Sequence, residues 1–365
     1  MALQLGLVGL PNVGKSTMFN ALTRAGALAA NYPFTTIDPN IGVVPVADPR
    51  LERVAEIVNP ERVVPTTLRV VDIAGLVKGA SHGEGLGNQF LAHIREVDAV
   101  AMVVRCFRDE NVPHVTETLD PVSDIEVVIT ELALADLAVL ERHLERLRSA
   151  AKGDPRAYAE RIAACERAMS LLAQGKPLYG AATSDVEQAA WAEPALILTK
   201  PMLYVANVAE DDLPAGGPLA TMVCEHAAAL GGETVVLCAS LEAELAEWEP
   251  ADAQALLAEY GLGATGRERL VWSAYHLLDL ITFFTTTGGR EVRAWTLRRG
   301  QTALDAAAQI HSDMARGFIR AEVVPYEALD RAGSWARVRE LGQLRLEGRD
   351  YVIADGDVVH IRFNV

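Results

Sequence analysis

The amino-acid sequence predicts an α/β fold, namely a doubly wound, mostly parallel sheet with an inserted helical hairpin and a small C-terminal α+β domain. Three observations support this. Short apolar runs alternate with segments of helical periodicity. A stretch of about 70 residues has helical spacing throughout, which is too long for a simple connection. The chain has 365 residues, too many for one core.

The strands of the predicted sheet are apolar segments that each end near glycine or polar residues. They cover residues 3–9, 63–72, 98–106, 202–207 and 234–238. Helical patterns separate them, which is typical of parallel strands joined by crossover helices.

Residues 122–195 interrupt this alternation. Apolar side chains recur there at helical spacing, with Arg and Glu between them: Ile125, Val128, Leu132, Leu140, Leu144 and Leu147. A turn at residues 152–155 (KGDP) precedes a second helical pattern that continues to Leu172. The pattern predicts an antiparallel helical hairpin inserted between two strands. Ordinary crossover helices are the alternative, and the length of the stretch favours an insertion.

From Thr285 onwards the pattern changes again. It predicts a strand at 292–297, a helix at 303–315 and two short strands at 351–353 and 358–363. These elements indicate a small mixed domain at the end of the chain.

Charge is unevenly distributed along the chain. The formal net charge is −16, which argues against a general nucleic-acid binder. Residues 281–365 contain 12 Arg, no Lys and 11 acidic residues, a balance of +1, so the other 280 residues carry −17. No apolar run reaches the roughly 18 residues of a membrane helix. The first residues lack a basic leader, and the four cysteines lack metal-ligand spacing, so we expect a cytoplasmic protein with reduced thiols.

Residues 9–17 (GLPNVGKST) match the phosphate-binding pattern G-x-x-x-x-G-K-[ST] between a predicted strand and a helix. Gly9 and Gly14 let the backbone turn its N–H groups towards phosphates. Lys15 supplies positive charge for the β and γ oxygens, and the Ser16 hydroxyl is a hard oxygen ligand for Mg²⁺. The pattern predicts a P-loop nucleotide hydrolase.

A second motif, Asp72 to Gly75 (DIAG), ends a predicted strand. Its Asp is expected near Mg²⁺, and the amide of Gly75 near the γ-phosphate. Between the two motifs, residues 31–36 (NYPFTT) form a plausible first switch in which Thr36 offers another hydroxyl to Mg²⁺. The glycine-rich stretch 75–87 is expected to be the second switch.

The base-recognition motif differs from that of GTP-binding proteins. Such proteins carry N-K-x-D after the fifth strand, whereas this chain has residues 207–210 (NVAE). Glu210 extends its carboxylate one methylene further than Asp, and Asn207 is able to pair with N6 and N7 of adenine. The motif predicts a preference for ATP over GTP. The alternative is that Asn207 caps a turn and does not contribute to selectivity.

Taken together, these motifs resemble the Obg-like ATPases of the YchF type, a branch of the Obg translation-factor GTPases. The segments that carry the resemblance are residues 9–17, 31–40, 72–91 (DIAGLVKGASHGEGLGNQFL), 207–210 and 291–323. The resemblance implies a P-loop domain (1–121 and 196–280), a coiled-coil insertion (122–195) and a C-terminal TGS domain (281–365). It also implies association with ribosomes.

The resemblance assigns roles by position. The residues that would wrap the phosphates are Asn12, Val13, Gly14, Lys15, Ser16 and Thr17. Ser16 and Thr36 would hold Mg²⁺, and Asn207 and Val208 would contact adenine with Glu210 close by. Asn12 also fits the family members that need K⁺ beside the phosphates.

Water activation is a separate problem. Leu76 stands where many GTPases place a glutamine that orients water, and its apolar side chain cannot do so. The family's replacement corresponds to His114, which becomes the candidate catalytic residue together with Lys15. Thr35 stands where several relatives have a cysteine, so redox sensing by that thiol does not carry over.

The sequence thus favours a Mg²⁺-dependent ATPase that acts as a switch on the translation machinery. An Obg-type GTPase, a non-catalytic ATP-sensing module and a P-loop kinase are the alternatives. We expect a monomer that binds neither membranes nor DNA.

Overall fold

The computed structural model describes residues 3–29, 40–73, 86–109, 111–113, 118–287 and 289–364. The chain divides into two compact units, each built from two segments. Unit 1 comprises Met1–Val44 and Arg69–Ala274, and unit 2 comprises Pro45–Leu68 and Tyr275–Val365. The described part contains no helix that is both long and apolar enough to cross a membrane.

The core of unit 1 is a sheet of strand order β2-β4-β1-β5-β6-β7. Its strands are β1 (Gln4–Val8), β2 (Ile41–Pro45), β4 (Thr67–Asp72), β5 (Ala99–Cys106), β6 (Met202–Val208) and β7 (Glu233–Leu237). β1 pairs in parallel with β4 and β5, β5 with β6, and β6 with β7. Every residue of β5 and β6 is buried, as expected of strands covered on both faces. The predicted doubly wound fold is confirmed.

Helices connect and cover these strands. They are α1 (Lys15–Ala29), α3 (Leu86–Glu96), α7 (Gly217–Ala229), α8 (Ala239–Leu245), α9 (Pro250–Glu259) and α10 (Gly266–Leu277), with 3₁₀ turns η2 (Ile197–Thr199) and η3 (Glu210–Asp212). Because the paired strands run in parallel, their carboxyl ends meet at one edge of the sheet. The described segments that directly follow β1, β5, β6 and β7 start there, at the edge where α/β proteins bind ligands.

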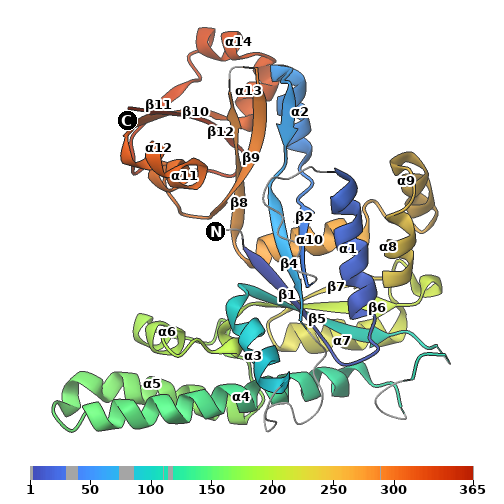
Figure 1. The fold of residues 1–365 in the computed structure, drawn as a ribbon, viewed down its shortest axis with the longest axis vertical. Coiled ribbons are helices and arrows are strands. Elements are labelled where there is room, and N and C mark those ends of the chain that lie inside the picture. Colours follow the sequence, from blue (N-terminus) through green and yellow to red (C-terminus); the bar gives the residue numbers. More distant parts are fainter. Residues whose placement is uncertain are drawn as a thin grey trace. The chain divides into compact units, whose positions relative to one another are not determined.

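The predicted antiparallel hairpin is confirmed as α4 (Pro121–Ala150) and α5 (Pro155–Ala173), which lie side by side in Figure 1. Both helices begin at an aspartate cap followed by proline, and the Asp120 and Asp154 side chains accept from backbone N–H groups of the first turn. α6 (Asp185–Ala192) packs on α5 through buried Trp191, whose indole N–H donates to Ala164 O at 2.8 Å.

A buried carboxylate fastens the hairpin to the sheet. Asp136 of α4 is fully buried and accepts from the backbone N–H groups of Ile197 and Leu198, both at 2.9 Å. Arg95, at the end of α3, places its Nη2 atom 3.7 Å from Asp136 Oδ1. Lys200 donates to the carbonyl of Arg95 at 2.9 Å, so α3, α4 and the entry to β6 meet at one point.

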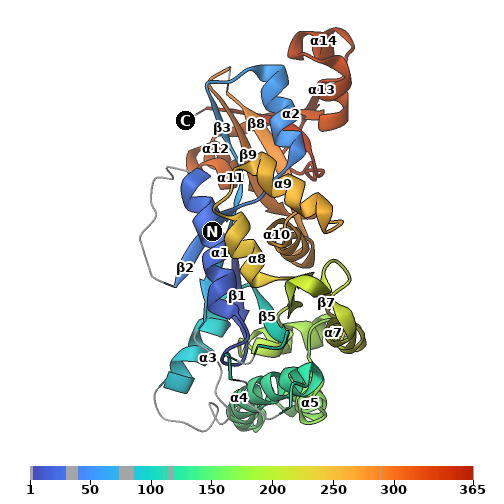
Figure 2. The ribbon, with the colours of Figure 1, turned by 90° about the vertical axis from the view of Figure 1, so that its right-hand side faces the viewer.

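Unit 2 is a mixed sheet of strand order β11-β10-β12-β8-β9-β3. Its strands are β3 (Arg62–Val64), β8 (Leu280–Thr286), β9 (Glu291–Arg298), β10 (Phe318–Pro325), β11 (Arg345–Glu347) and β12 (Asp357–Phe363), and its helices are α2 (Pro49–Val58), α11 (Ala303–Ile310), α12 (Ser312–Arg316), α13 (Tyr326–Ala332) and α14 (Trp335–Glu340). Figure 2 shows α11 and α12 on one face of this sheet and α2 and α13 on the other. Separate clusters of buried side chains, one including Phe283 and Ala307 and one including Leu51 and Leu329, fill the two faces.

The structure corrects the predicted boundary of the nucleotide-binding domain. The sequence places residues 45–68 in that domain, but they belong to unit 2, where β3 pairs in parallel with β9 and α2 contributes Leu51 and Val54 to the core. The predicted single strand 63–72 is two strands in different sheets, β3 and β4. Pro65 lies between them, and proline cannot donate a ladder hydrogen bond.

Several elements of unit 2 also differ from the prediction. The helix expected at 303–315 divides at His311, whose extended backbone ends α11 and whose side chain accepts from Asp313 N at the start of α12. The strand expected at 351–353 is an isolated bridge between Val352 and Thr302. β8 and β10 were not identified from the sequence.

Candidate functional site

The loop between β1 and α1 has the conformation that its glycines predict. Gly14 has a φ of 90° and Asn12 a φ of 65°, both in the left-handed region. A Cβ atom at Gly14 would lie 2.3 Å from Asn207 Nδ2, and one at Gly9 would lie 2.6 Å from the carbonyl oxygen of Val103. Glycine is therefore required at both positions for backbone and neighbour to approach this closely.

The structure brings the two phosphate and metal motifs together. Lys15 is only 8% exposed, and its ammonium forms an ion pair with Asp72 Oδ1 at the end of β4. Ser16 Oγ lies 3.4 Å from Asp72 Oδ2. Thr36 and Gly75, which the sequence assigns to the metal and the γ-phosphate, lie outside the described residues.

This group fits a Mg²⁺ ion, because the Ser16 hydroxyl and the Asp72 carboxylate are hard oxygen donors on adjacent elements. Among the residues that the structure describes, no group of three or more His, Cys, Asp or Glu side chains gathers to hold a metal by itself. A cation here would therefore take further oxygens from phosphate and water, as Mg²⁺ usually does in nucleotide sites.

Asn207 holds the phosphate loop in place. The side chain is 4% exposed, its Nδ2 donates to the carbonyl of Val13, and its Oδ1 accepts from the N–H of Ala239, both at 2.9 Å. The alternative in which this residue has a structural role thus has direct support. One amide hydrogen and one lone pair of Oδ1 remain for a base, so contact with adenine is compatible with the anchor.

A cavity of about 800 Å³ lies at this edge of the sheet. Three loops and the start of a helix line it: the phosphate loop, the loop after β5, the loop after β6 and the first residues of α8. The lining residues include Asn12, Gly14, Lys15, Ser16, Thr17, Phe107, Arg108, Asp109, Val112, Asn207, Val208, Glu210 and Ser240. The phosphate motif and the base motif therefore open into one space, which is large enough for a nucleotide.

Arg105 was not identified from the sequence, although it organises one wall of this cavity. It is 3% exposed at the end of β5, beside Asn207 in the sheet. Its guanidinium donates to the carbonyls of Val112 (2.9 Å), Phe107 (3.1 Å) and Asp109 (3.3 Å). It also lies 4.6 Å from the centre of the Phe107 ring, within cation–π range. The only sequence signal was a charge at the end of an otherwise apolar strand.

Glu210 also has a partner that the sequence did not suggest. Its carboxylate is exposed at the rim of the cavity, where Oε1 accepts a hydrogen bond from the hydroxyl of Tyr260. This hydrogen bond is the main reason why the pKa of Tyr260 rises to about 12. Tyr260 immediately follows α9, fifty residues further along the chain.

His114 lies outside the described residues, as does the following stretch to residue 117. Its neighbour Pro113 accepts a hydrogen bond from Asn12 Nδ2 at 3.1 Å. The loop that carries His114 is therefore tied to the phosphate loop one residue earlier.

Known proteins resemble this chain along its whole length. A family model described as 50S ribosome-binding GTPase matches residues 4–137, and the model YchF-GTPase_C, described as a protein of unknown function, matches residues 280–364. The chain is 47% identical to the ribosome-binding ATPase YchF of Bacillus subtilis and 48% identical to that of Haemophilus influenzae, over the full length of both chains in each pair.

A solved structure resembles the whole chain as well. The YchF GTPase of Schizosaccharomyces pombe superimposes with a TM-score of 0.89 at 34% identity, covering 99% of this chain and 97% of the other. Sequence identity over the full length, the two family models and the shared fold agree with one another. The chain therefore belongs to the YchF family of P-loop NTPases.

Proposed function

We propose that the protein hydrolyses ATP in preference to GTP, with Mg²⁺ at Ser16 and Asp72, and acts as a nucleotide-controlled switch on the ribosome. The observation that carries this proposal is the single cavity into which both the phosphate loop and the N-V-A-E loop open. We further propose that it works in the cytoplasm as a monomer.

The phosphate end of the cavity suits a bound triphosphate. Lys15 is a nearly buried cation whose present partner is Asp72, so phosphate oxygens would compete with that carboxylate for it. Bound Mg²⁺, held by Ser16, Asp72 and, by resemblance, Thr36, would neutralise charge that develops on the phosphates. Asn12 is the residue that would favour K⁺ beside them.

Base selection is proposed to depend on Glu210 and on the backbone around Val208. Asn207 contributes mainly as the anchor between the phosphate loop and α8, because its side-chain Nδ2 and Oδ1 atoms each already form a hydrogen bond with the backbone. This loop lacks the lysine of N-K-x-D and carries a longer acidic side chain. Both differences favour adenine over guanine. A GTPase is the second candidate, because the matched domain family and the Schizosaccharomyces pombe protein are described as GTPases.

Water activation is proposed to use His114, with Lys15 stabilising the transferred phosphoryl group. Phosphoryl transfer depends on positioning and charge stabilisation, and Leu76 supplies neither. The loop from Phe107 to Pro113 leads from the cavity wall to His114. An imidazole at its end would be able to hold a water molecule at neutral pH.

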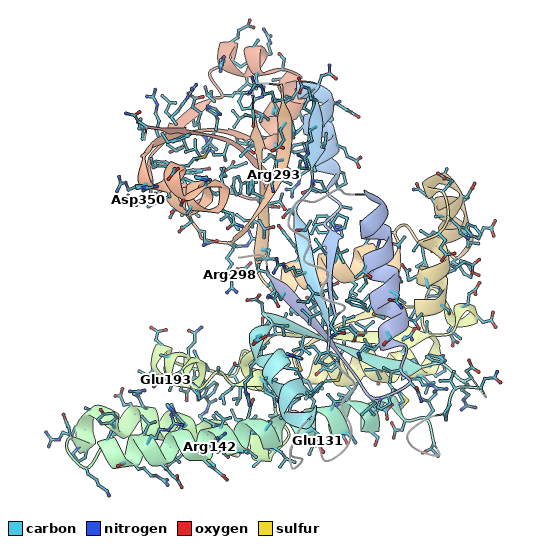
Figure 3. The ribbon with its side chains drawn as sticks, viewed as in Figure 1. Glu131, Arg142, Glu193, Arg293, Arg298 and Asp350 are labelled. Carbon is cyan, nitrogen blue, oxygen red and sulfur yellow. The ribbon has the colours of Figure 1, made fainter. Side chains whose placement is uncertain are left out.

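The ribosome as partner comes from the relatives. The proteins of Bacillus subtilis and Haemophilus influenzae are named ribosome-binding ATPases, and they match this chain from end to end. Arginines on both units offer candidate phosphate contacts, among them the exposed Arg142 of α4 and Arg298 of β9, labelled in Figure 3.

Titration of the purified protein tests the proposal. Calorimetry with non-hydrolysable ATP and GTP analogues and Mg²⁺, in K⁺ and in Na⁺ buffer, is expected to give the lower Kd for the ATP analogue. A GTP analogue that binds tenfold more tightly would overturn it.

In turnover assays Lys15→Ala should be inactive but folded, because it removes charge-assisted contacts of about 1.5–3 kcal/mol each. His114→Ala should lose tenfold or more in kcat, about 1.4 kcal/mol, with affinity within about threefold.

A further inference from the structure

Glu210 and Tyr260 form a pair at the rim of the nucleotide cavity. Glu210 begins η3, one residue beyond the strand that carries Asn207, and its carboxylate is exposed. Tyr260 caps the C-terminal end of α9, and its hydroxyl donates to Glu210 Oε1. Both residues belong to unit 1.

The two residues lie differently with respect to the cavity. Glu210 is among the residues that line it, whereas Tyr260 is not. The hydrogen bond therefore draws Oε1 towards a partner outside the cavity wall. Oε2 is the carboxylate oxygen that this hydrogen bond does not hold.

The number of available oxygens matters because the two purines differ in their donors. On its pairing edge guanine presents two adjacent donors, N1–H and the 2-amino group, and a carboxylate recognises both only when its two oxygens face the base together. Adenine presents one donor group there, the 6-amino group, which needs a single acceptor. A carboxylate that offers one oxygen thus matches adenine and leaves one guanine donor unpaired, which is costly in a desolvated site.

We propose that Tyr260 is a specificity-determining residue that acts through Glu210, by turning one carboxylate oxygen away from the base and so disfavouring GTP. The inference rests on the proposed preference for ATP and names the residue that enforces it. Without Tyr260 the glutamate, with its extra methylene, is able to rotate and present both oxygens to guanine.

The chemistry of the pair supports a hydrogen bond that persists at neutral pH. The pKa of Tyr260 is raised to about 12, first by the hydrogen bond to Glu210 and then by burial and nearby acids, including Asp211. The phenol therefore remains a donor throughout the physiological range. An exposed pair of this kind is worth little for stability. Its removal should therefore leave the fold unchanged, so binding measurements are interpretable.

The test compares Tyr260→Phe with the wild type. Kd values are measured by calorimetry for β,γ-methylene ATP and β,γ-methylene GTP with Mg²⁺. The variant is expected to reduce the ratio of Kd for GTP to Kd for ATP by about fivefold or more, with unchanged melting temperature. Tyr179→Phe, an exposed tyrosine of the same unit that does not line the cavity, is the matched control and should leave the ratio unchanged.

A double-mutant cycle shows whether Tyr260 acts through Glu210. In a Glu210→Ala background, Tyr260→Phe should no longer alter the ratio, and a persisting effect would overturn the inference. An unaltered ratio in Tyr260→Phe, with wild type still preferring ATP, would refute the role of Tyr260 and leave the proposed function standing. A wild type that prefers GTP would instead refute the proposed function itself.

Discussion

At the scale of single residues, Arg105 shows how one buried side chain shapes the candidate site. Burying a guanidinium is costly unless its donors are satisfied. Here three carbonyls of a single loop accept from it, and the Phe107 ring packs against it. The Arg105 side chain of β5 therefore fixes the conformation of the loop that follows this strand.

Replacing Arg105 by lysine is expected to weaken nucleotide binding. A single ammonium keeps the charge but cannot reach three carbonyls in a planar fork, so the loop that supplies Phe107 and Val112 to the cavity would lose its support. We expect Kd for a non-hydrolysable nucleotide to rise about five- to tenfold, roughly 1–1.4 kcal/mol. Arg69→Lys, at an exposed position of β4, is the control. An unchanged Kd in Arg105→Lys would show that the loop holds its shape without the guanidinium.

At the scale of elements, the hairpin depends on its attachment as well as on its own packing. α4 and α5 pack against each other along apolar faces, which include Leu140 and Ala168. Asp136 joins this hairpin to η2 by two hydrogen bonds. The Arg95 side chain, at the end of α3, forms an ion pair with the same carboxylate. The hairpin and α3 therefore share one polar junction.

Asp136→Ala is expected to lower the free energy of unfolding at neutral pH by about 2–6 kcal/mol, since two buried N–H groups at roughly 1–3 kcal/mol each lose their acceptor. Urea unfolding measures this, with Glu141→Ala, an exposed position of the same helix, as control.

The effect should also depend on pH. Burial raises the pKa of Asp136 above its ordinary 3.8, so the folded protein retains this proton to higher pH than the unfolded chain does. The proton-linked part of the contribution of Asp136 to stability is then largest in acid and is lost as pH rises through the raised pKa, whereas its hydrogen bonds to the two backbone N–H groups contribute at neutral pH as well. The difference between wild type and Asp136→Ala should widen as pH falls towards 4. A difference that narrows would contradict this sign.

At the scale of the whole molecule, the chain leaves unit 1 after β2 and returns to it in β4. The excursion supplies α2 and β3 to unit 2, where Leu51 and Val54 complete the cluster around Leu329. The C-terminal segment alone is thus an incomplete domain.

A fragment of residues 275–365 is expected to fold poorly, whereas the same fragment fused to residues 45–68 through a flexible linker should unfold cooperatively. Loss of each large apolar side chain from such a core costs about 2–5 kcal/mol, which is comparable with the whole stability of a domain this small. Thermal unfolding followed by circular dichroism distinguishes the two. A Leu51→Ser, Val54→Ser version of the fusion is the control, and a cooperative transition in the fragment alone would count against the prediction.

The sequence predicted those features that depend on residues close together in the chain, and it missed those that depend on residues far apart. Lys15 and Ser16 belong to a contiguous motif whose chemistry is legible from spacing, so their proximity to Asp72 could be expected. Neither the Tyr260 contact with Glu210 nor the contacts of Arg105 leave any such pattern, because they depend on where distant loops fold.

The misplacement of residues 45–68 has the same origin. The sequence pattern predicted no separate α2 and merged β3 with β4 into one strand. Nothing local shows which sheet these residues join. The partner strand β9 lies more than 200 residues further along the chain. Pro65 was visible in the sequence and would have marked the break between β3 and β4.

Unit 2 is built from two distant chain segments, and this also fixes the order in which its parts become available during synthesis. Residues 45–68 leave the ribosome early, whereas the next part of unit 2 begins only at Tyr275. At about 5–20 residues per second, the interval is roughly 10–40 s. Throughout it, the apolar stripe of α2 is without the sheet that buries it in the finished protein. The nascent chain must therefore keep this stripe from premature contacts, and its carboxyl-terminal strand β12, placed inside the sheet, is the last piece needed to close the fold.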